Sequence, residues 1–399
     1  GSASELLDRA WQCLHEAVAQ PVHIEMAADV LLNSVMGRPL EAESAPTPTP
    51  TSTRADGRNL DELVRRLSMA TRPVVVARPS ASRGASGGLL VQLSDRLRVR
   101  PLITESPRGL SDLKYIDVIP HLSESDCTLV VAPSDFAVGF LSRDVIARDG
   151  YLALIDAPSD PQPMHQPDIR VTADQEAVLR ALLDRLPAAT RTDPSWAEMW
   201  QPQPPPLSPD EDDEDGLHPL KVCEVVREMI RPEDTLILDG GEFCQWVRLG
   251  LRDLPNRMLW NGKLGAIGGS IPMALGLAAS QPPGRVIALL GDGAAGYHLS
   301  EFETATRYGL PFVAIVGNDA RWAAEWHMQA SRYGPDRTFE TELTWARYDI
   351  AAAGFGGIGY MADNAGDLWG AFNRSLSAGV PSCINVFVRA VRSPAVLRE

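Results

Sequence analysis

Two short apolar runs near the end of the chain are each followed by polar residues, and this feature constrains the fold most. Residues 286–290 (VIALL) lead into a Gly-Asp-Gly triplet centred on Asp292, and residues 312–316 (FVAIV) lead into Gly-Asn-Asp, which contains Asn318. Continuous apolar runs of this length are typical of strands buried on both faces of a parallel sheet. Because open α/β sheets bind ligands at the carboxyl ends of their strands, we expect Asp292 and Asn318 to lie side by side there.

The side chains at these strand ends suit a hard cation. Asp292 offers a carboxylate, Asn318 an amide oxygen, and Ala320 a main-chain carbonyl just downstream. Mg²⁺ binds few protein oxygens and completes an octahedron with water and substrate phosphates. The glycines beside Asp292 allow main-chain N–H groups to approach a phosphate. The pattern indicates a diphosphate bound through magnesium, while a strand-end turn followed by an Asn helix cap is the explanation without a ligand.

The spacing between this triplet and Asn318 resembles the cofactor motif of thiamine-diphosphate (ThDP) enzymes. From about Lys221 to its end, the chain is similar to the acetolactate synthase and benzaldehyde lyase group of that family. The resemblance implies that Asp292, Asn318 and the carbonyl of Ala320 are magnesium ligands. Where the family usually has an Asn-Asn pair, this chain reads Gly317-Asn318, so that the ligand position is kept.

Two further segments carry the resemblance. Residues 264–272 (LGAIGGSIP) resemble the segment that holds the aminopyrimidine ring, which implies that the carbonyl of Gly265 accepts a hydrogen bond from its 4′-amino group and that Ile267 bends ThDP into its V shape. Residues 239–243 (DGGEF) resemble the loop that touches the diphosphate, with a tight strand-to-helix turn as the alternative. The expected cofactor contacts are Gly240, Gly241, Glu242, Phe243, Gly265, Ala266, Ile267, Gly291, Gly293, Ala294 and Ala295.

Aromatic and titratable residues beyond the second strand are candidates for a substrate pocket. Trp322 and Trp326 are one helical turn apart and share a face, which favours an aromatic or acyl pocket, while core packing explains them equally well. Glu325 and His327 are candidates for proton transfer, with solvated helix residues as the alternative. His298, which follows the Gly-Asp-Gly triplet, is a further pocket candidate.

Composition excludes several classes of function. The formal net charge of −15 argues against a nucleic-acid or anionic-membrane surface. No apolar run approaches the length of a membrane span, and no signal peptide is recognised. The five cysteines are scattered without a CxxC pair, as is typical of a reducing compartment. We therefore expect a cytoplasmic protein that acts on small molecules.

Composition also divides the chain into segments. Residues 1–37 begin with an amphipathic helix, continue with a strand at 21–26 and a short helix near 30–35, and are too short to form a core. Residues 38–58 are a linker rich in Pro and Thr. Residues 59–187 alternate strand and helix, and the strand candidates are TRPVVVA, RPLIT, CTLVVA, YLALID and IRVTA.

The segment 59–187 resembles the central domain of ThDP enzymes, which binds a nucleotide in some members. Its loop at 78–84 lacks the expected glycine pattern, which favours a structural spacer over an anion site. Residues 188–217 are a second, unpacked linker, whose acidic run lacks the spacing of a calcium loop. Residues 218–399 are the ThDP diphosphate-binding domain. The predicted fold class is α/β, with two doubly wound, mostly parallel-sheet domains.

ThDP enzymes need a carboxylic acid against N1′ of the pyrimidine ring. In the family this glutamate comes from the pyrimidine-binding domain of a neighbouring subunit, and residues 1–37 resemble only the end of that domain. No catalytic glutamate can therefore be named in this chain. Either the sequence is a piece of a longer protein or the enzyme is divided between two genes, and its opening helix and strand favour the second. We expect a small pyrimidine-binding partner subunit, two copies of each chain, and negligible turnover by this chain alone.

The resemblance implies a ThDP- and Mg²⁺-dependent carboligase or lyase that acts on 2-keto acids, aldehydes or acyloins. Simple decarboxylation of a 2-keto acid or acyl-CoA analogue is the alternative enzyme. A non-catalytic cofactor-binding or regulatory subunit is the alternative of another class, and the joint presence of Asp292, Asn318, Gly265 and Ile267 argues against it. An NAD-linked dehydrogenase is disfavoured because no GxGxxG follows a first strand.

Overall fold

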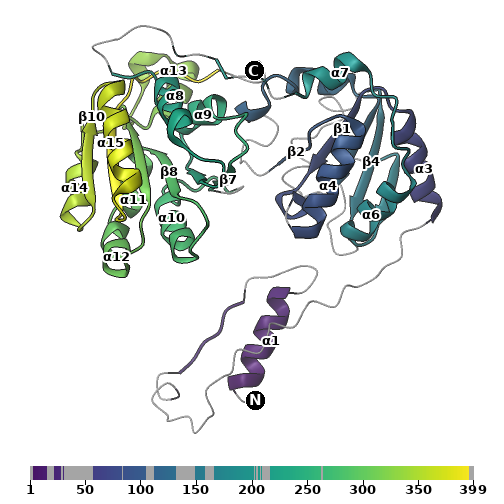
Figure 1. Cartoon of the computed structure of the whole chain (residues 1–399), viewed down its shortest axis with the longest axis horizontal. Coiled ribbons are helices and arrows are strands. Elements are labelled where there is room, and N and C mark those ends of the chain that lie inside the picture. Colours follow the sequence, from purple (N-terminus) through teal and green to yellow (C-terminus); the bar gives the residue numbers. More distant parts are fainter. Residues whose placement is uncertain are drawn as a thin grey trace. The chain divides into compact units, whose positions relative to one another are not determined.

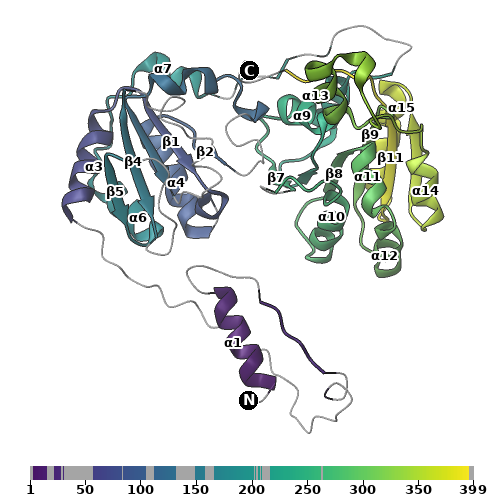
Figure 2. The ribbon, with the colours of Figure 1, turned by 180° about the vertical axis from the view of Figure 1, so that it is seen from behind.

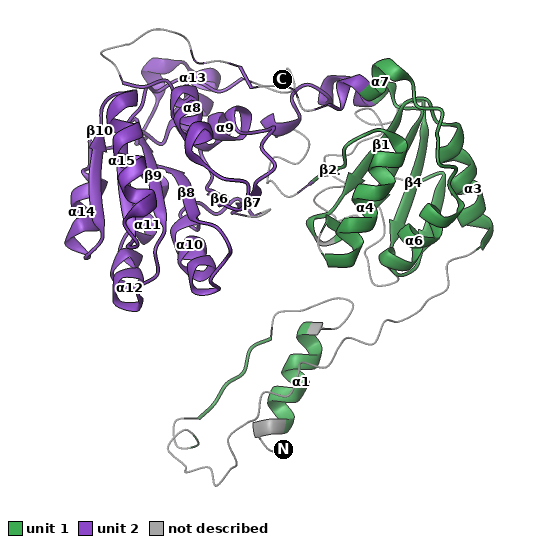
Figure 3. Ribbon diagram, viewed as in Figure 1, with its two compact units in different colours: residues 1–103, 123–197 green, residues 104–122, 198–399 purple. Residues whose placement is uncertain are grey.

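The computed structural model describes residues 3–15, 22–27, 30, 57–82, 84–104, 112–131, 149–157, 166–201, 203, 205–206, 208, 216–261 and 264–394. The chain divides into two compact units, shown in Figure 3. The N-terminal unit comprises residues 1–103 and 123–197, and the C-terminal unit comprises residues 104–122 and 198–399. Within the described parts of the chain, no helix combines the length and the apolar character that a membrane span needs.

The N-terminal unit is built on a parallel sheet of five strands in the order β2-β1-β3-β4-β5, flanked by helices (Figure 1). Every strand coincides with one of the predicted apolar runs. Helices α4 and α6 contact each other, and α3 contacts β5. The elements are α3 (Gly57–Met69), β1 (Pro73–Ala77), α4 (Gly84–Leu97), β2 (Leu102–Ile103), β3 (Cys127–Val131), β4 (Tyr151–Asp156), β5 (Ile169–Thr172), α6 (Gln175–Arg185) and α7 (Pro194–Met199).

The expected loop and linkers differ in detail from the structure. Residues 79–82, after β1, form a single 3₁₀ turn, η1 (Pro79–Ser82). Helix α3 already begins at Gly57, inside the first predicted linker. The second linker is packed at its start, because Trp196 is buried and its indole Nε1 donates to the carbonyl of Pro73 at 2.9 Å. The acidic run at 210–215 lies outside the described residues.

The beginning of the chain contains the predicted amphipathic helix, α1 (Ala3–His15). Its apolar side chains Leu6, Leu7, Trp11 and Leu14 are exposed. The strand predicted at 21–26 is wrong for the described part of that segment, since residues 22–27 have no regular structure. A strand needs a neighbour to accept its main-chain hydrogen bonds, and the described residues provide none there. Of the short helix predicted near 30–35, only Val30 lies among the described residues.

The C-terminal unit contains a six-stranded sheet, all parallel, in the order β10-β11-β9-β8-β6-β7 (Figure 2). Its strands are β6 (Thr235–Leu238), β7 (Arg257–Trp260), β8 (Val286–Gly291), β9 (Val313–Asn318), β10 (Ile358–Ala362) and β11 (Ser382–Phe387). Its helices are α8 (Pro219–Met229), α9 (Glu242–Gly250), α10 (Ser270–Ala279), α11 (Asp292–His298), α12 (Glu301–Tyr308), α13 (Ala323–Tyr333), α14 (Tyr348–Gly354) and α15 (Ala365–Ser377). Short 3₁₀ turns are η3 (Leu113–Tyr115), η4 (Ile119–Glu124) and η5 (Pro335–Arg337).

Two apolar clusters cover the two faces of this sheet. One joins α8, α9 and α15 to the strands through residues such as Val226, Val247 and Phe372. The other joins α10, α11, α12 and α14 through residues such as Ile271 and Phe302. The central strands β8 and β9 are therefore buried on both sides, which explains their uninterrupted apolar sequences and confirms the predicted doubly wound fold.

Residues 104–122, which the sequence assigns to the central domain, belong instead to the C-terminal unit. The buried ion pair between Asp112 and Arg248 holds this segment on α9, with Arg248 Nε donating to Asp112 Oδ1 at 2.7 Å. The guanidinium of Arg248 also stacks 3.3 Å from the ring centroid of Trp260.

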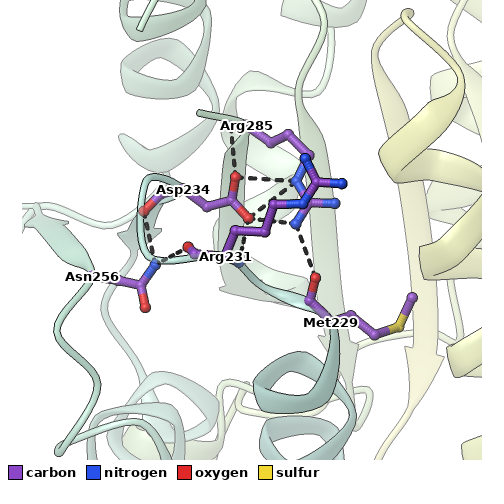
Figure 4. Close-up of polar contacts among 5 residues, drawn as sticks. All are labelled: Met229, Arg231, Asp234, Asn256 and Arg285. Carbon is purple, nitrogen blue, oxygen red and sulfur yellow. Dashed lines mark hydrogen bonds and ion pairs between the residues drawn. The ribbon is translucent and has the colours of Figure 1, made fainter. Parts of the chain in front are cut away.

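A hydrogen-bonded network fastens the amino ends of β6 and β8, and Figure 4 shows it. The carboxylate of Asp234 accepts hydrogen bonds from the main-chain N–H groups of Arg231 and Arg285, both at 2.8 Å, and from the Arg285 guanidinium. The guanidinium also donates to the carbonyl of Met229 at 2.9 Å. The Asn256 amide donates to the carbonyls of Arg231 and Asp234.

Candidate cofactor and metal site

A pocket of about 230 Å³ opens at the carboxyl ends of β6, β8 and β9 in the C-terminal unit. Most of the predicted cofactor contacts line it. Among the candidates that do not are Ala266, Ala295, Asn318, Ala320, His298 and Trp326. The lining residues are Gly240, Gly241, Glu242, Phe243, Gln245, Asn261, Gly265, Ile267, Gly291, Asp292, Gly293, Ala294, Gly317, Asp319, Arg321, Trp322, Ala323, Ala324 and Glu325.

The buried carboxylate of Asp239 connects two walls of the pocket. Its Oδ1 accepts hydrogen bonds from the main-chain N–H groups of Gly240 and Gly268 at 2.8 and 2.9 Å, and its Oδ2 accepts one from Ser270 at 2.9 Å. The 264–270 loop is thereby fixed to the end of β6. This role of Asp239 was not predicted from the sequence. The one signal for it there was an Asp at a strand end before two glycines.

Glycines allow these walls to come close together. A Cβ atom on Gly240 would lie 2.8 Å from Cγ2 of Ile267, so the two loops are in direct contact there. Gly241 has a φ of 90°, which favours glycine, and a Cβ atom at this position would meet no described atom within 4 Å. A Cβ atom on Gly291 would likewise meet no described atom within 4 Å. Two of the glycines thus leave room for a ligand against the main chain.

Asp292 begins α11 and is almost completely buried. Its Oδ1 accepts a hydrogen bond from the N–H of Gly293 at 2.8 Å, and its Oδ2 accepts one from the N–H of Arg321 at 3.2 Å. These neutral donors do not compensate for burial, which raises the pKa of Asp292 to about 6.

Asp319, which the sequence analysis did not nominate, is a second carboxylate in the pocket. Burial and, next, the charge of Asp292 raise the pKa of Asp319 to about 7. A buried carboxylate that raises the pKa of a half-buried neighbouring carboxylate is a favourable environment for a divalent cation. No group of three or more His, Cys, Asp or Glu side chains in the described parts of the chain could hold a metal ion. A metal ion bound here would therefore need main-chain carbonyls, water or a phosphate as its further ligands.

The side chain of Asn318 faces away from this pocket. Its Nδ2 donates to the carbonyl of Ala346 at 3.0 Å and to Oδ1 of Asn385 at 3.2 Å, and its Oδ1 accepts the N–H of Ala320 at 3.1 Å. Because side chains alternate between the faces of a strand, Asp319 and not Asn318 faces the pocket. The expected juxtaposition of Asp292 with Asn318 is thus corrected to Asp292 with Asp319.

The carbonyl of Ala320 is also directed elsewhere. It accepts the N–H of Leu343 at 2.6 Å, while the N–H of Trp322 donates to the carbonyl of Thr341 at 2.8 Å. Between them, the N–H of Arg321 faces Asp292, and in extended backbone the carbonyl of a residue points to the same side as its N–H. The main-chain carbonyl on the Asp292 side therefore belongs to Arg321.

The predicted pocket residues of α13 have different surroundings. Trp322 lines the pocket and packs on the Gly-Asp-Gly turn, where a Cβ atom on Gly293 would lie 2.5 Å from its ring. Glu325 also lines the pocket. Trp326 does not; its ring lies 5.0 Å from the guanidinium of Arg321 and 5.1 Å from the ring of His327. Trp322 is thus a pocket residue, whereas Trp326, four residues later, contacts Arg321 and His327 outside the pocket lining.

Three polar side chains complete the surroundings. Nδ1 of His298 lies 2.8 Å from the carbonyl of Gly268, so His298 supports the 264–270 loop, and it is not among the residues that line the pocket. Glu242 Oε1 accepts the N–H of Ser393, which ties the pocket wall to the end of the described chain. Among the described residues, His327 Nε2 is buried without a hydrogen-bond partner, and burial lowers the pKa of His327.

Comparisons with known proteins agree with this geometry. Residues 239–386 match the family described as "Thiamine pyrophosphate enzyme, C-terminal TPP binding domain". An acetolactate synthase large subunit of Mycobacterium tuberculosis is 27% identical over 96% of this chain and 71% of its own length. A 2-hydroxyacyl-CoA lyase 2 of Mus musculus is 37% identical over 36% of this chain and 23% of the lyase. A benzoylformate decarboxylase of Pseudomonas aeruginosa is 25% identical over 82% of this chain and 63% of the decarboxylase. Residues 239–386 of the C-terminal unit therefore match the cofactor-binding domain of the thiamine-diphosphate enzymes, and the chain as a whole is similar to acetolactate synthases.

Proposed function

We propose that this chain is the cofactor-binding subunit of a ThDP- and Mg²⁺-dependent carboligase or lyase that acts on 2-keto acids or acyloins. The observation that carries the proposal is the pair of carboxylates, the buried Asp292 and the half-buried Asp319, in a pocket walled by the 240–241 and 265–267 loops. A cation is the simplest means of stabilising both carboxylates in their ionised forms.

In this proposal Mg²⁺ is held by Asp292, Asp319 and the carbonyl of Arg321. The raised pKa values of both carboxylates and the oxygen donors available fit a hard cation, with diphosphate oxygens and water completing the octahedron. The family's Asn-Asn pair then corresponds to Asn318-Asp319, one residue later than predicted from the sequence. Asn318 keeps a supporting role in this arrangement through its bonds to Ala346 and Asn385.

The loops around the pocket suit the organic part of ThDP. The open space beside Gly241 and Gly291 accommodates the diphosphate, and the N-terminus of α9 adds its positive dipole end. Ile267 offers an apolar surface and Gly265 a carbonyl to the aminopyrimidine ring, since both line the pocket. When bound, ThDP supplies a nucleophilic carbon and an electron sink for making or breaking a C–C bond at a carbonyl.

Magnesium dependence is tested by titrating the chain with ThDP, with Mg²⁺ or with EDTA. Trp322 lines the pocket, so quenching of tryptophan fluorescence reports binding. We expect binding with Mg²⁺ and a large loss of affinity in EDTA, because two carboxylates repel a diphosphate unless a cation lies between them. Thiamine without its diphosphate is the control. Equal ThDP affinity with and without a divalent ion would contradict the metal assignment.

We further propose that a partner subunit supplies the acid that activates the pyrimidine ring. Two acidic side chains other than the metal pair line the pocket, Glu242 and Glu325. Glu242 is held by Ser393, and neither is on a loop that we assign to the pyrimidine ring. The exposed apolar side of α1 (Leu6, Leu7 and Leu14) is a suitable contact surface for such a partner, in an assembly of two copies of each chain.

If a partner subunit supplies the activating acid, the chain should be active only when it is mixed with that partner. The chain is assayed with pyruvate, ThDP and Mg²⁺, alone and with a purified protein that carries a pyrimidine-binding domain. Substituting Leu6, Leu7 and Leu14 by Ser serves to break the proposed contact, because it removes the apolar surface of α1 and leaves the pocket unchanged. Full turnover by the chain alone would refute the proposal.

Simple decarboxylation is the second candidate reaction, supported by the similarity to a benzoylformate decarboxylase. Product analysis distinguishes the two reactions. A carboligase joins two carbonyl compounds into one product, whereas a decarboxylase releases an aldehyde. A non-catalytic role predicts tight ThDP binding with no turnover under either condition.

A further inference from the structure

The charge of the pocket lining is unbalanced. Four carboxylic acids line it, Glu242, Asp292, Asp319 and Glu325, and among the described lining residues the single cationic side chain is Arg321. A 2-keto acid carries its own carboxylate, which these acids repel. Once Mg²⁺ is assigned to Asp292 and Asp319 and to the diphosphate, Arg321 is the remaining cation in the described lining that can attract an anionic substrate.

The structure holds the main chain of Arg321 firmly and leaves its guanidinium accessible. Its N–H is bonded to Asp292, and the residues on either side pair with Thr341 and Leu343. The side chain is 33% exposed and lies 5.0 Å from the centroid of the Trp326 ring. Its ion-pair neighbour, Glu342, is 4.0 Å away and 73% exposed, so that this pair is weak.

Compensation of Asp319 is the competing role for this arginine. Among the described residues, the ion-pair partner of the Arg321 guanidinium is Glu342, at 4.0 Å, and not Asp319. Arg321 therefore forms no ion pair with Asp319, and its guanidinium lies within cation–π distance of Trp326, 5.0 Å from the ring centroid.

We propose that Arg321 binds the carboxylate of the 2-keto acid substrate and so selects anionic donors, an inference that rests on the proposed function. The planar fork of a guanidinium matches a carboxylate in a bidentate manner, which fixes orientation as well as charge. Arg321 follows directly after the proposed metal-binding segment that contains Asp319 and lines the same pocket. Trp322 and Glu325 border the same part of the pocket.

The test compares Arg321→Gln and Arg321→Lys with Arg332→Gln, a control at an exposed arginine of α13 outside the pocket lining. The full chain, with its partner where one is required, is loaded with ThDP and Mg²⁺. Steady-state kinetics are measured with pyruvate and benzoylformate and with the uncharged donors acetaldehyde and benzaldehyde. Binding of methyl acetylphosphonate, an anionic analogue of pyruvate, is measured by calorimetry and does not depend on turnover.

We expect Arg321→Gln to lower kcat/KM for the 2-keto acids about 10- to 100-fold, mainly through KM, and to weaken the phosphonate by a similar factor. Arg321→Lys is intermediate because it keeps the charge and loses the fork. Aldehyde kinetics, ThDP affinity and the Arg332→Gln control remain within about twofold of the unaltered chain, a margin below the effect of one charged hydrogen bond.

Three results would overturn the inference. They are unchanged phosphonate affinity in Arg321→Gln, equal losses for aldehydes and 2-keto acids, or a parallel loss of ThDP affinity, which would assign Arg321 to the diphosphate. Failure of the unaltered chain to bind ThDP with Mg²⁺ is a different outcome, because it defeats the proposed function itself.

Discussion

Acidic residues at the two edges of the C-terminal sheet have pKa values that are shifted in opposite directions. At the amino ends of β6 and β8, burial by itself would raise the pKa of Asp234, but the hydrogen bonds from Arg285 and from the Arg231 N–H outweigh it and lower that pKa. At the carboxyl ends, burial raises the pKa of Asp292 and of Asp319, and the protein gives them only weak compensation.

The difference separates structural from functional carboxylates. The amino-edge network in Figure 4 satisfies its charges internally, with Asp234 paired to a guanidinium and two N–H groups. The carboxyl edge is left incomplete, so that a ligand has to complete it. Substitutions at the first edge should change stability and leave binding intact, and substitutions at the second should do the reverse.

The largest effect is expected for Asp234→Ala. It leaves the partly buried Arg285 guanidinium without its partner and should lower the free energy of unfolding by about 3 kcal/mol. Urea denaturation measures this loss. Glu303→Ala, in an exposed Arg307–Glu303 pair of α12, is the matched control and should have little effect. A comparable loss of ThDP affinity in the Asp234→Ala protein at low denaturant would contradict the separation of the two edges.

Substitution of the two pocket carboxylates should act mainly on binding. Asp292→Asn should weaken ThDP binding in Mg²⁺ by about 100-fold, because both of its carboxylate oxygens accept main-chain N–H bonds and an amide group can replace only one of them. Asp319→Asn should weaken it by only about 10-fold, since an amide oxygen can still ligate the ion. Thermal denaturation without cofactor should show that neither variant loses stability. If Asn318→Ala reduced magnesium dependence more than Asp319→Ala, the assignment of Asp319 would be wrong.

The pH dependence of stability should differ between the edges. Asp234 has a lowered folded pKa, so its stabilisation is present above its unfolded pKa of about 3.9 and disappears as the pH falls below it. Asp292 and Asp319 have raised folded pKa values, so the cofactor-free protein should lose stability as the pH rises from about 4 to 7. Melting temperatures across pH 3 to 8, with and without Mg²⁺ and ThDP, test this. Asp319→Asn should reduce the loss of stability of the cofactor-free protein between about pH 4 and 7. An unaltered loss in that variant would show that Asp319 is not its cause.

The smallest effect is expected at a supporting residue. His298→Ala removes the contact with the carbonyl of Gly268 and should weaken ThDP by about 5-fold, the order of one neutral hydrogen bond. Fluorescence titration measures the change. His121→Ala, outside the pocket lining, is the control.

The succession of elements was largely predictable because it depends on local patterns. The strands β1, β3, β4, β6, β8 and β9 are apolar runs ended by polar or glycine residues. The strands β7, β10 and β11 were not predicted. The edge strands Arg257–Trp260 and Ile358–Ala362 are partly exposed and lack a clear apolar run, and the buried inner strand Ser382–Phe387 is interrupted by Asn385. In β10, position 359 has to be glycine because α14 packs against it. A Cβ atom there would lie 2.0 Å from the carbonyl oxygen of Asp349.

The sequence by itself determined the α/β class, the glycine loops and the presence of acids at the ends of buried strands, because strand burial and turn chemistry are written in consecutive residues. Only the tertiary structure decided which of two adjacent side chains, Asn318 or Asp319, faces the pocket. That choice depends on hydrogen bonds to Ala346 and Asn385, which are distant in sequence and adjacent only after the sheet has formed. The roles of Asp239 and Arg321 were likewise decided by contacts between segments that local patterns cannot bring together.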